Sequence, residues 1–320
     1  MNKNTLFIIN INNNNKGENM NKWTKAGLTA LSASLVSVSA QAGSLDVAGG
    51  ASITFHSDQA AGHGNPYSHN ESITFTGSGD LDNGMTIDYS HVMMNGSATT
   101  SSNLKIGMGD GGTLTYGVGI SGGVRSYDSV IPTAKEEAWD DLAGEANNVS
   151  GQSGDDSFVY TGSFGGVDFT AQYTKNGSGS ASDSSIGASY TIGDTGLTIG
   201  YATGEDGSST DETVTYAKFV LGGATIGYSK MDVEISSSTN DREITGYGAS
   251  FAVNEDLSVS YGKSVVDFDN SATDQEASGA SISYTMGSIT AAAASNKETG
   301  TGGTSGSEDK MTEVTVSFAF

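Results

Sequence analysis

A two-residue alternation of apolar and small polar side chains recurs along the chain from residue 45 onward. Each run spans about ten residues and ends at Gly, Asp, Asn or Ser. In TGLTIGYATG, for example, Leu197, Ile199 and Tyr201 alternate with Thr, Gly and Ala. Alternate side chains of a strand face opposite sides of the sheet. The pattern therefore predicts an all-β protein whose strands each have one apolar and one small polar face.

The alternation predicts sixteen strands. They lie near residues 45–55, 70–80, 84–94, 101–109, 112–120, 156–164, 166–175, 183–192, 195–204, 211–220, 222–231, 242–253, 256–266, 276–286, 288–297 and 309–320. An even number suits a closed antiparallel meander with both termini at one end. With about 17 residues for each strand and its turn, we expect strands of roughly 9–11 residues, the length that crosses a bilayer at a tilt.

The polar parity is too small and hydrophilic to form a protein core. It consists of Thr, Ser, Gly, Ala and Asp, including Asp88 and Asp168. A soluble sandwich would need large side chains on this face to offset chain entropy. We therefore predict that lipid covers the apolar face and that water lies against the polar face. The sheet should close, because an open edge would leave unpaired backbone groups in hydrocarbon.

Aromatic residues near the strand ends support this orientation, whereas one lysine disturbs it. The aromatic residues are predicted to lie at the membrane interface: Phe55, Tyr89, Tyr116, Phe164, Tyr173, Tyr190, Tyr201, Tyr228, Tyr261 and Tyr284. Lys218 breaks the alternation in VTYAKFVL. This break indicates a bulge, a lysine that extends to the interface, or a different register in that strand.

The N-terminus is predicted to be a signal peptide over residues 20–42. Two lysines precede a mild apolar stretch, and a small-x-small cleavage pattern ends at Ala42, before Gly43. Residues 1–19 precede a second Met and are interpreted as an upstream mis-start. The mature barrel domain would then comprise residues 43–320.

The charge of the chain argues against one class of partner. The net charge is −23, and there are no cysteines. Removal of residues 1–42 takes away four lysines and one glutamate, which leaves ten basic and 36 acidic residues and a net charge of −26. Because nucleic-acid binding is driven by Lys and Arg, nucleic acid is not expected as a partner.

The chain ends within an alternating strand, VTVSFAF, at Phe320. With the signal peptide and sixteen strands, this ending resembles the Gram-negative general porins. Residues 102–117, SNLKIGMGDGGTLTYG, are similar to the strand–turn–strand that precedes the constriction loop of that family. The resemblance implies a 16-stranded antiparallel transmembrane β-barrel and a homotrimer in the outer membrane, with lipid and lipopolysaccharide around it. It also implies that Phe318 and Phe320 are read by the barrel-assembly machinery and that the last strand pairs with the first.

One long segment, residues 121–155, interrupts the strands. Its stretch IPTAKEEAWDDLAGE predicts a short helix that begins near Pro132, ends at Gly144 and presents Trp139 and Leu142 as an apolar face. Long loops in compact proteins are often functional. In the family that the chain resembles, the third extracellular loop folds inward and narrows the pore, and this segment follows the fifth strand.

The charged residues of this constriction loop suggest ion selectivity. The predicted acidic constriction comprises Asp128, Glu136, Glu137, Asp140, Asp141 and Glu145, and the basic residues of the constriction or wall are Arg125, Lys135, Lys105 and Arg242, with Lys175 and Lys263 as weaker wall candidates. The resembled family opposes such acids with a basic wall cluster, which is sparse here. The sequence therefore favours cations over anions. The alternative, a solvated acidic helix face, stays open.

Other ligand sites receive less support, and no metal or cofactor site is predicted. His56, His63 and His69 lie with Asp58 and Glu71 in the first loop, but their spacing fits no tight metal motif. GMGDGG is better explained as a turn than as a calcium-binding repeat. The acidic loops GEDGSSTDE and GSEDK are candidates for weak Ca²⁺ binding only.

The sequence predicts a channel for passive diffusion of small hydrophilic solutes and ions. No P-loop, G-x-S-x-G or H-E-x-x-H motif supports catalysis. A substrate-selective channel of the same fold would need a row of aromatic residues inside the barrel. A secreted acidic adhesin or calcium-binding β-rich protein is the alternative from another class.

Overall fold

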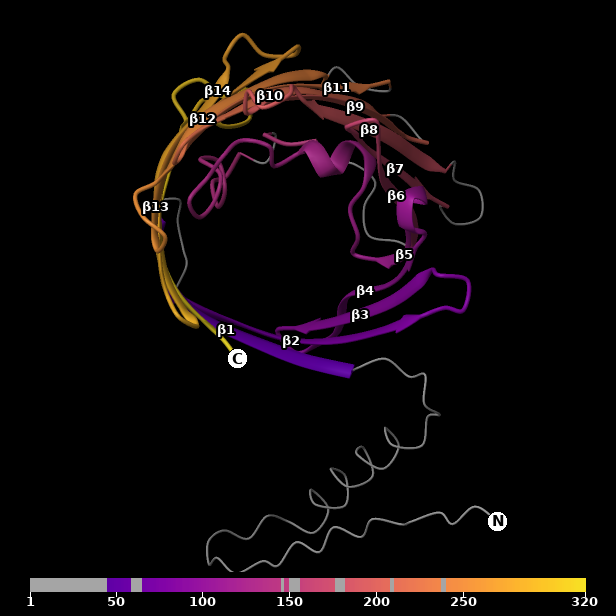
Figure 1. Cartoon of the computed structure of the whole chain (residues 1–320). Coiled ribbons are helices and arrows are strands. Elements are labelled where there is room, and N and C mark those ends of the chain that lie inside the picture. Colours follow the sequence, from indigo (N-terminus) through magenta and orange to yellow (C-terminus); the bar gives the residue numbers. More distant parts are fainter. Residues whose placement is uncertain are drawn as a thin grey trace, which may run out of the picture. The chain divides into compact units, whose positions relative to one another are not determined.

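The chain folds into a closed barrel of sixteen antiparallel strands (Figure 1). The computed structural model describes residues 45–58, 65–144, 147–149, 156–175, 182–207, 210–236 and 240–320. The predicted signal peptide with its cleavage point, Ala42 and Gly43, and the upstream residues 1–19 lie outside these ranges. Each strand pairs with its neighbours in the sequence, and β1 pairs with β16.

The observed strands begin and end within four residues of the predicted ones. They are β1 (Leu45–Asp58), β2 (Tyr67–Asp80), β3 (Thr86–Met94), β4 (Ser97–Gly107), β5 (Thr113–Val118), β6 (Ser157–Phe164), β7 (Val167–Thr174), β8 (Asp183–Thr191), β9 (Leu197–Asp206), β10 (Thr210–Leu221), β11 (Ala224–Ile235), β12 (Arg242–Ala252), β13 (Leu257–Phe268), β14 (Gln275–Met286), β15 (Ile289–Thr299) and β16 (Glu308–Ala319). Three 3₁₀ turns join them: η1 (Gly109–Gly111), η2 (Gly123–Tyr127) and η3 (Thr301–Gly303). The GMGDGG segment contains η1, so it is a turn, as predicted.

The first and last strands close the barrel. Their register runs from Gly50 opposite Ala319 to Asp58 opposite Met311. The terminal residue continues the ladder, since the Gly49 N–H donates to the Phe320 oxygen at 2.7 Å and the Phe320 N–H donates to the Gly49 oxygen at 2.9 Å. The predicted pairing of the last strand with the first is confirmed. Within the described residues, no helix has the length and hydropathy of a membrane span.

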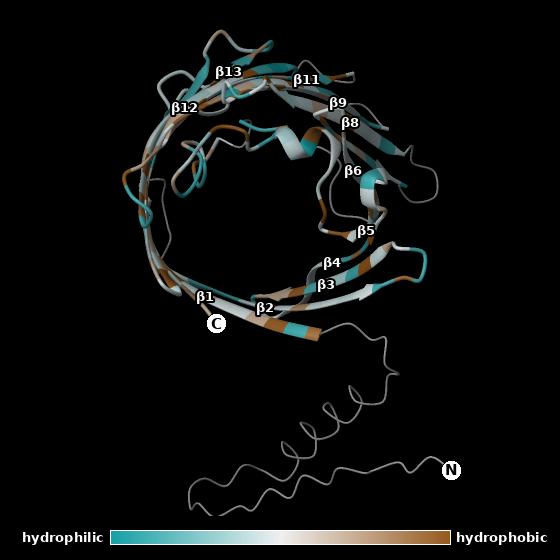
Figure 2. Cartoon of the chain, viewed as in Figure 1, coloured by the Kyte–Doolittle hydropathy of each residue, from teal (hydrophilic) through white to brown (hydrophobic). Residues whose placement is uncertain are grey.

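The apolar face of most strands is exposed on the outside of the barrel. All ten aromatic residues predicted at the membrane interface are exposed, and so are Leu221 of β10 and Phe251 of β12. Figure 2 shows hydrophobic and hydrophilic residues alternating along β1 and β3. Exposure of large apolar side chains on a closed sheet is expected of a barrel that is surrounded by lipid.

In β10 to β13 the apolar face changes sides along the strand. Ile226 and Tyr228 are exposed on β11, whereas Met231 and Val233, on the opposite parity, are 1% exposed inside the barrel. On the outer face of the same region, Lys230 pairs with Glu243 at 2.7 Å. The expectation that apolar residues face only lipid is therefore wrong for this part of the wall, because a loop covers its inner face.

The same change of side explains Lys218. Strand β10 pairs with β9 and β11 without a break in register, so there is no bulge. Lys218 lies on the parity of Val214 and Tyr216, which are both buried inside the barrel. Of the three explanations for Lys218, a different register is the correct one. The residues of this strand that the alternation would assign to lipid face the inside of the barrel.

Candidate functional site

The described part of the loop after β5 follows the inner wall of the barrel (Figure 1). At its start, the Gly122 N–H donates to Oε1 of Gln172 on β7 at 2.8 Å. Further along, the Ala134 N–H donates to Oγ of Ser260 on β13 at 2.9 Å, and the Ala143 N–H donates to Oδ2 of Asp309 on β16 at 2.8 Å. The loop therefore lies inside the barrel and bonds to strands from β7 to β16.

The predicted helix near Pro132 is wrong. The described part of the loop contains the 3₁₀ turn η2 and a single turn near Trp139, but no α-helix. Its backbone N–H groups donate to wall side chains, as Lys135 does to Oγ of Ser281 at 3.1 Å. These bonds replace the i to i−4 bonds of a helix. Asp141 adopts a φ of 58°, which also breaks helical geometry.

Two apolar clusters hold the loop against the wall. Val124, Tyr127 and Val149 of the loop pack with wall residues that include Val214 and Ile244. The second cluster joins loop and wall residues: Ile131, Ala138, Trp139 and Leu142 of the loop pack against Ala277 and Met311. Burial of one large apolar side chain stabilises a fold by about 1.5–3 kcal/mol. Trp139 and Leu142 thus anchor the loop to the barrel wall as an apolar pair, but they do not lie on a helix.

Glycines of the inner wall make room for the loop. A Cβ atom at Gly227 of β11 would collide with Pro132, and one at Gly187 of β8 would collide with the ring of Tyr127. Tyr127 instead packs on Tyr216, with ring centroids 5.4 Å apart. Absence of a side chain at these wall positions is therefore what lets the loop approach the sheet.

The predicted acidic constriction residues differ widely in exposure. Glu137 is 7% exposed, Asp128, Glu136 and Asp140 are half-buried, Asp141 is exposed, and Glu145 lies outside the described residues. Burial, with Asp140 and Asp128 nearby, raises the pKa of Glu137 to about 8. Burial likewise raises the pKa of Asp128 to about 6. Near neutral pH, Glu137 is therefore mostly protonated and contributes little charge.

Most of the remaining loop charges have partners. Lys135 forms close ion pairs with Glu136 and with Glu313 of β16. Nδ2 of Asn296 donates to Oε1 of Glu136 at 3.2 Å and to the backbone oxygen of Asp140 at 3.1 Å. Burial raises the pKa of both Glu136 and Asp140. The loop acids thus serve partly to attach the loop to β15 and β16.

The predicted basic residues do not form one cluster opposite the acids. Arg125 is exposed on η2, and Arg242 is half-buried at the start of β12. Lys105 lies on the inner face of β4, opposite Asp88 of β3 in the register. The weaker wall candidates also lie apart, since Lys263 pairs with Glu276 on the outer face at 2.5 Å and Lys175 follows β7. Lys135 pairs with acids of the loop and of β16, and Arg125 interacts electrostatically with Asp128.

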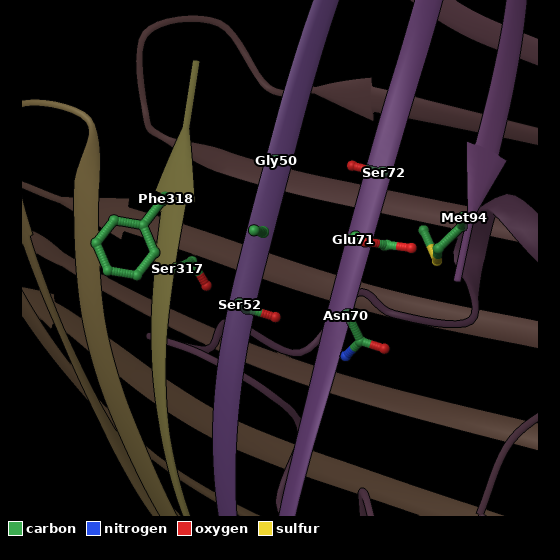
Figure 3. Close-up of a pocket in the computed structure, with 9 residues that line it drawn as sticks. Gly50, Ser52, Asn70, Glu71, Ser72, Met94, Ser317 and Phe318 are labelled. Carbon is green, nitrogen blue, oxygen red and sulfur yellow. The ribbon is translucent and has the colours of Figure 1, made fainter. Parts of the chain in front are cut away.

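The wall of β1 to β3 has a different lining. Figure 3 shows Ser52 of β1 and Asn70 and Ser72 of β2 on adjacent strands, beside a pocket that Gly50 and Met94 also line. Lys105 and Asp88 line another pocket on this side of the barrel. Small polar side chains of the kind predicted from the sequence thus face inward here.

The candidate calcium ligands of GSEDK are separated by the sheet. His56 and His69 likewise lie on opposite faces of their strands, and His63 lies outside the described residues. Glu308 and Asp309 of GSEDK face opposite sides of β16, and Glu308 pairs with Lys310 and with Lys297, the latter at 3.5 Å. These two acids cannot share an ion. GEDGSSTDE is only partly described, and there Oδ1 of Asp206 accepts from the Thr210 N–H at 3.3 Å.

Sequence reasoning missed the wall residues that receive the loop. They are Thr170, Gln172, Ser260, Ser281, Asn296, Asp309 and Glu313. All lie on the small polar face of their strands. The alternation does not distinguish the polar residues that bind the loop from those that face solvent. Glu313 had one signal, since an acid is unusual in the final apolar run.

Known proteins resemble this chain in sequence pattern and in fold. A family model described as Gram-negative porin matches residues 27–319. A porin structure refined at 1.8 Å is 17% identical, with a TM-score of 0.67 and coverage of 87% of this chain and 100% of the other. Two variants of the porin of Rhodopseudomonas blastica are each 16% identical with a TM-score of 0.64 and the same coverage. None of the curated protein sequences matches the chain.

Proposed function

The chain belongs to the Gram-negative porin family, and from this premise we propose that it forms a water-filled outer-membrane channel for passive diffusion of small hydrophilic solutes and ions. The observation that carries the proposal is the closed barrel whose large apolar side chains are exposed outside and whose loop is bonded along the inside. A β-roll adhesin has no such closed antiparallel sheet, so that alternative is set aside.

The outer surface supports a position for the membrane. Charged residues replace apolar ones on the outer face toward the strand ends that bear the loop: Lys230, Glu243, Lys263, Glu276, Lys297, Glu308 and Lys310. We place lipid tails below this charged row and lipopolysaccharide head groups at the row. As in the porin family, the assembled channel is a homotrimer. An unboiled sample should migrate as a trimer on a denaturing gel and as a monomer after boiling.

The end of the chain supports a role in assembly. Phe320 is 80% exposed, and Phe318 is exposed on the outer face of β16. An exposed aromatic terminus is open to recognition by the barrel-assembly machinery. Deletion of Phe320 should lower the amount of folded protein in the outer membrane, whereas Leu221→Ala, which removes an exposed side chain from the end of β10, should leave it unchanged.

We propose a cation preference that increases with pH. Asp141 is the exposed acid of the described constriction loop, and the mature chain is strongly acidic. Asp128, with a pKa of about 6, and Glu137, with a pKa of about 8, add negative charge beside the pore as the pH rises. A ring of acids attracts cations and repels anions.

Planar-bilayer recordings under a KCl gradient test both statements. We expect stable water-filled pores whose reversal potential favours K⁺ over Cl⁻ more strongly at pH 9 than at pH 5. A reversal potential that favours anions throughout would refute the cation preference and leave the channel intact. Absence of conductance from folded trimers would refute the channel itself.

A further inference from the structure

Three ligand-type side chains converge on the inner wall from separate segments of the chain. His56 comes from β1, Asp141 from the constriction loop and Glu313 from β16, and one donor atom of each lies within 4.8 Å of the others. Nδ1 of His56 is 3.1 Å from Oε2 of Glu313. We propose that these three residues bind a divalent transition-metal ion of the zinc class. Passive diffusion does not require this site.

The spacing suits a shared ion. Two ligands of a tetrahedral zinc ion, each about 2.1 Å from the metal, lie about 3.4 Å apart, and Nδ1 of His56 and Oε2 of Glu313 are separated by 3.1 Å. Asp141 is an exposed loop residue, so its carboxylate can rotate toward the other two ligands. Three protein ligands leave a fourth position for water, as in zinc sites with an open position.

A residue outside the trio orients the imidazole. Nε2 of His56 lies 3.2 Å from Oγ of Ser68 on β2. When Nε2–H donates to this hydroxyl, the lone pair of Nδ1 points at Oε2 of Glu313. In this tautomer a metal ion held by both Nδ1 and Oε2 offsets the repulsion between the lone pair and the carboxylate, whereas without a metal a proton on Nδ1 can bridge the same two atoms. Histidine ligands usually donate the second ring N–H to an oxygen in this way.

The charges around the three proposed ligands are compatible with a bound divalent cation. Lys135 contacts Oε1 of Glu313 and a carboxylate oxygen of Glu136. The Thr315 hydroxyl also donates to Oε1 of Glu313, at 3.2 Å, so Oε2 remains directed at His56. With neutral His56, one ammonium stands against the carboxylates of Glu136, Asp141 and Glu313. Asp140 also interacts electrostatically with Asp141 and Lys135. The carboxylates around the site therefore outnumber the single ammonium, which favours a divalent cation.

The ligand set selects the class of metal. Imidazole with carboxylates suits zinc, nickel or copper, whereas Ca²⁺ prefers oxygen ligands alone. His69 cannot contribute, because it lies on the outward parity of β2 with Ile73. A bound ion would tie the loop to β1 and β16, the two strands that close the barrel.

Zinc titration of the untagged, detergent-solubilised protein tests the site. After treatment with a chelator, isothermal calorimetry should show one Zn²⁺ per protomer, and tenfold excess Ca²⁺ should not compete. His56→Ala and Asp141→Asn should each weaken zinc binding at least tenfold. His69→Ala and His91→Ala, which change histidines on the outer parity, should bind zinc as the unaltered protein does. Heat-modifiable migration on gels verifies that each variant is folded.

Binding is measured without reference to conductance, so its failure is separate from failure of the channel. Absence of zinc binding by the folded, unaltered protein would overturn the site. Unchanged affinity in both His56→Ala and Asp141→Asn would also overturn it, as would loss of binding in His69→Ala alone. Zinc X-ray absorption should show one nitrogen ligand per ion, and a spectrum with only oxygen ligands would exclude His56.

Discussion

Two regions of the inner wall use the same alternation in opposite ways. In the packed wall, formed by the inner faces of β10 to β13, Val214, Met231, Val233, Ile244 and Val266 are buried beneath the loop. In the polar wall, formed by the inner faces of β1 to β4, Ser52, Ser72 and Lys105 line pockets. An inner face can therefore be apolar where protein covers it and polar where it borders the lumen. What covers a face decides its composition.

The largest expected effect comes from the apolar anchors of the loop. Trp139→Ala removes a side chain that is 5% exposed, and such truncations cost about 3–5 kcal/mol. We expect the loop of Trp139→Ala to become sensitive to protease and the pore current to become noisier. Digestion followed by mass spectrometry measures the cleavage. Thr76→Ala in the polar wall is the matched control, and equal cleavage in both variants would contradict the distinction between the two walls.

A glycine pair compares the walls more directly. Gly227→Ala places a Cβ in collision with the ring of Pro132, whereas Gly50→Ala places one 3.3 Å from Oγ of Ser72, the end of a side chain that can rotate away. Overpacking of this kind costs about 1–3 kcal/mol, so Gly227→Ala should lower the temperature at which the folded trimer dissociates on gels, and Gly50→Ala should not. The comparison fails if the two variants melt alike.

The buried Glu137 should make loop attachment sensitive to pH. Its pKa of about 8 in the folded protein lies above the usual value of a glutamate, so the folded state binds the proton more tightly than the unfolded state. Attachment is then strongest at low pH and weakens as the pH rises toward 8. Glu137→Gln should remove this dependence. Protease resistance of the loop at pH 5 and pH 9 measures it, and an equally steep loss of resistance in Glu137→Gln would exclude Glu137 as the cause.

The smallest effects are expected from exposed charges on either side of the pore. Asp141→Asn should shift the reversal potential toward anions, and Lys105→Gln of the polar wall should shift it toward cations. Each effect is on the order of 1 kcal/mol or less, because water screens the charges. Recordings at low and at high salt should show both shifts decreasing with ionic strength. Shifts of the same sign in the two variants would contradict the proposed positions of these charges.

The candidate site was predictable only in part. The loop was identified from its length, and its acids and apolar Trp139 and Leu142 from its composition, whereas its inward course was implied by the resemblance to porins. The burial of Glu137 and the ion pair of Lys135 with Glu313 were not, because they join residues far apart in sequence. Asn296, for example, donates to the backbone of Glu137 across 159 positions. A sequence pattern within one strand or loop cannot reveal contacts between residues so far apart in the chain.

The sequence by itself determined the number of strands, their approximate boundaries and the closure of β1 on β16. These follow from a period-two pattern and from the need of a sheet in lipid to pair every backbone group. Only the tertiary structure decided which side of β10 to β13 the apolar residues face, that the loop is extended rather than helical, and that His56 meets Asp141 and Glu313. Those outcomes depend on which segment packs against the inner face. The alternation within a strand is the same whether its inner or its outer face is covered, so it cannot predict them.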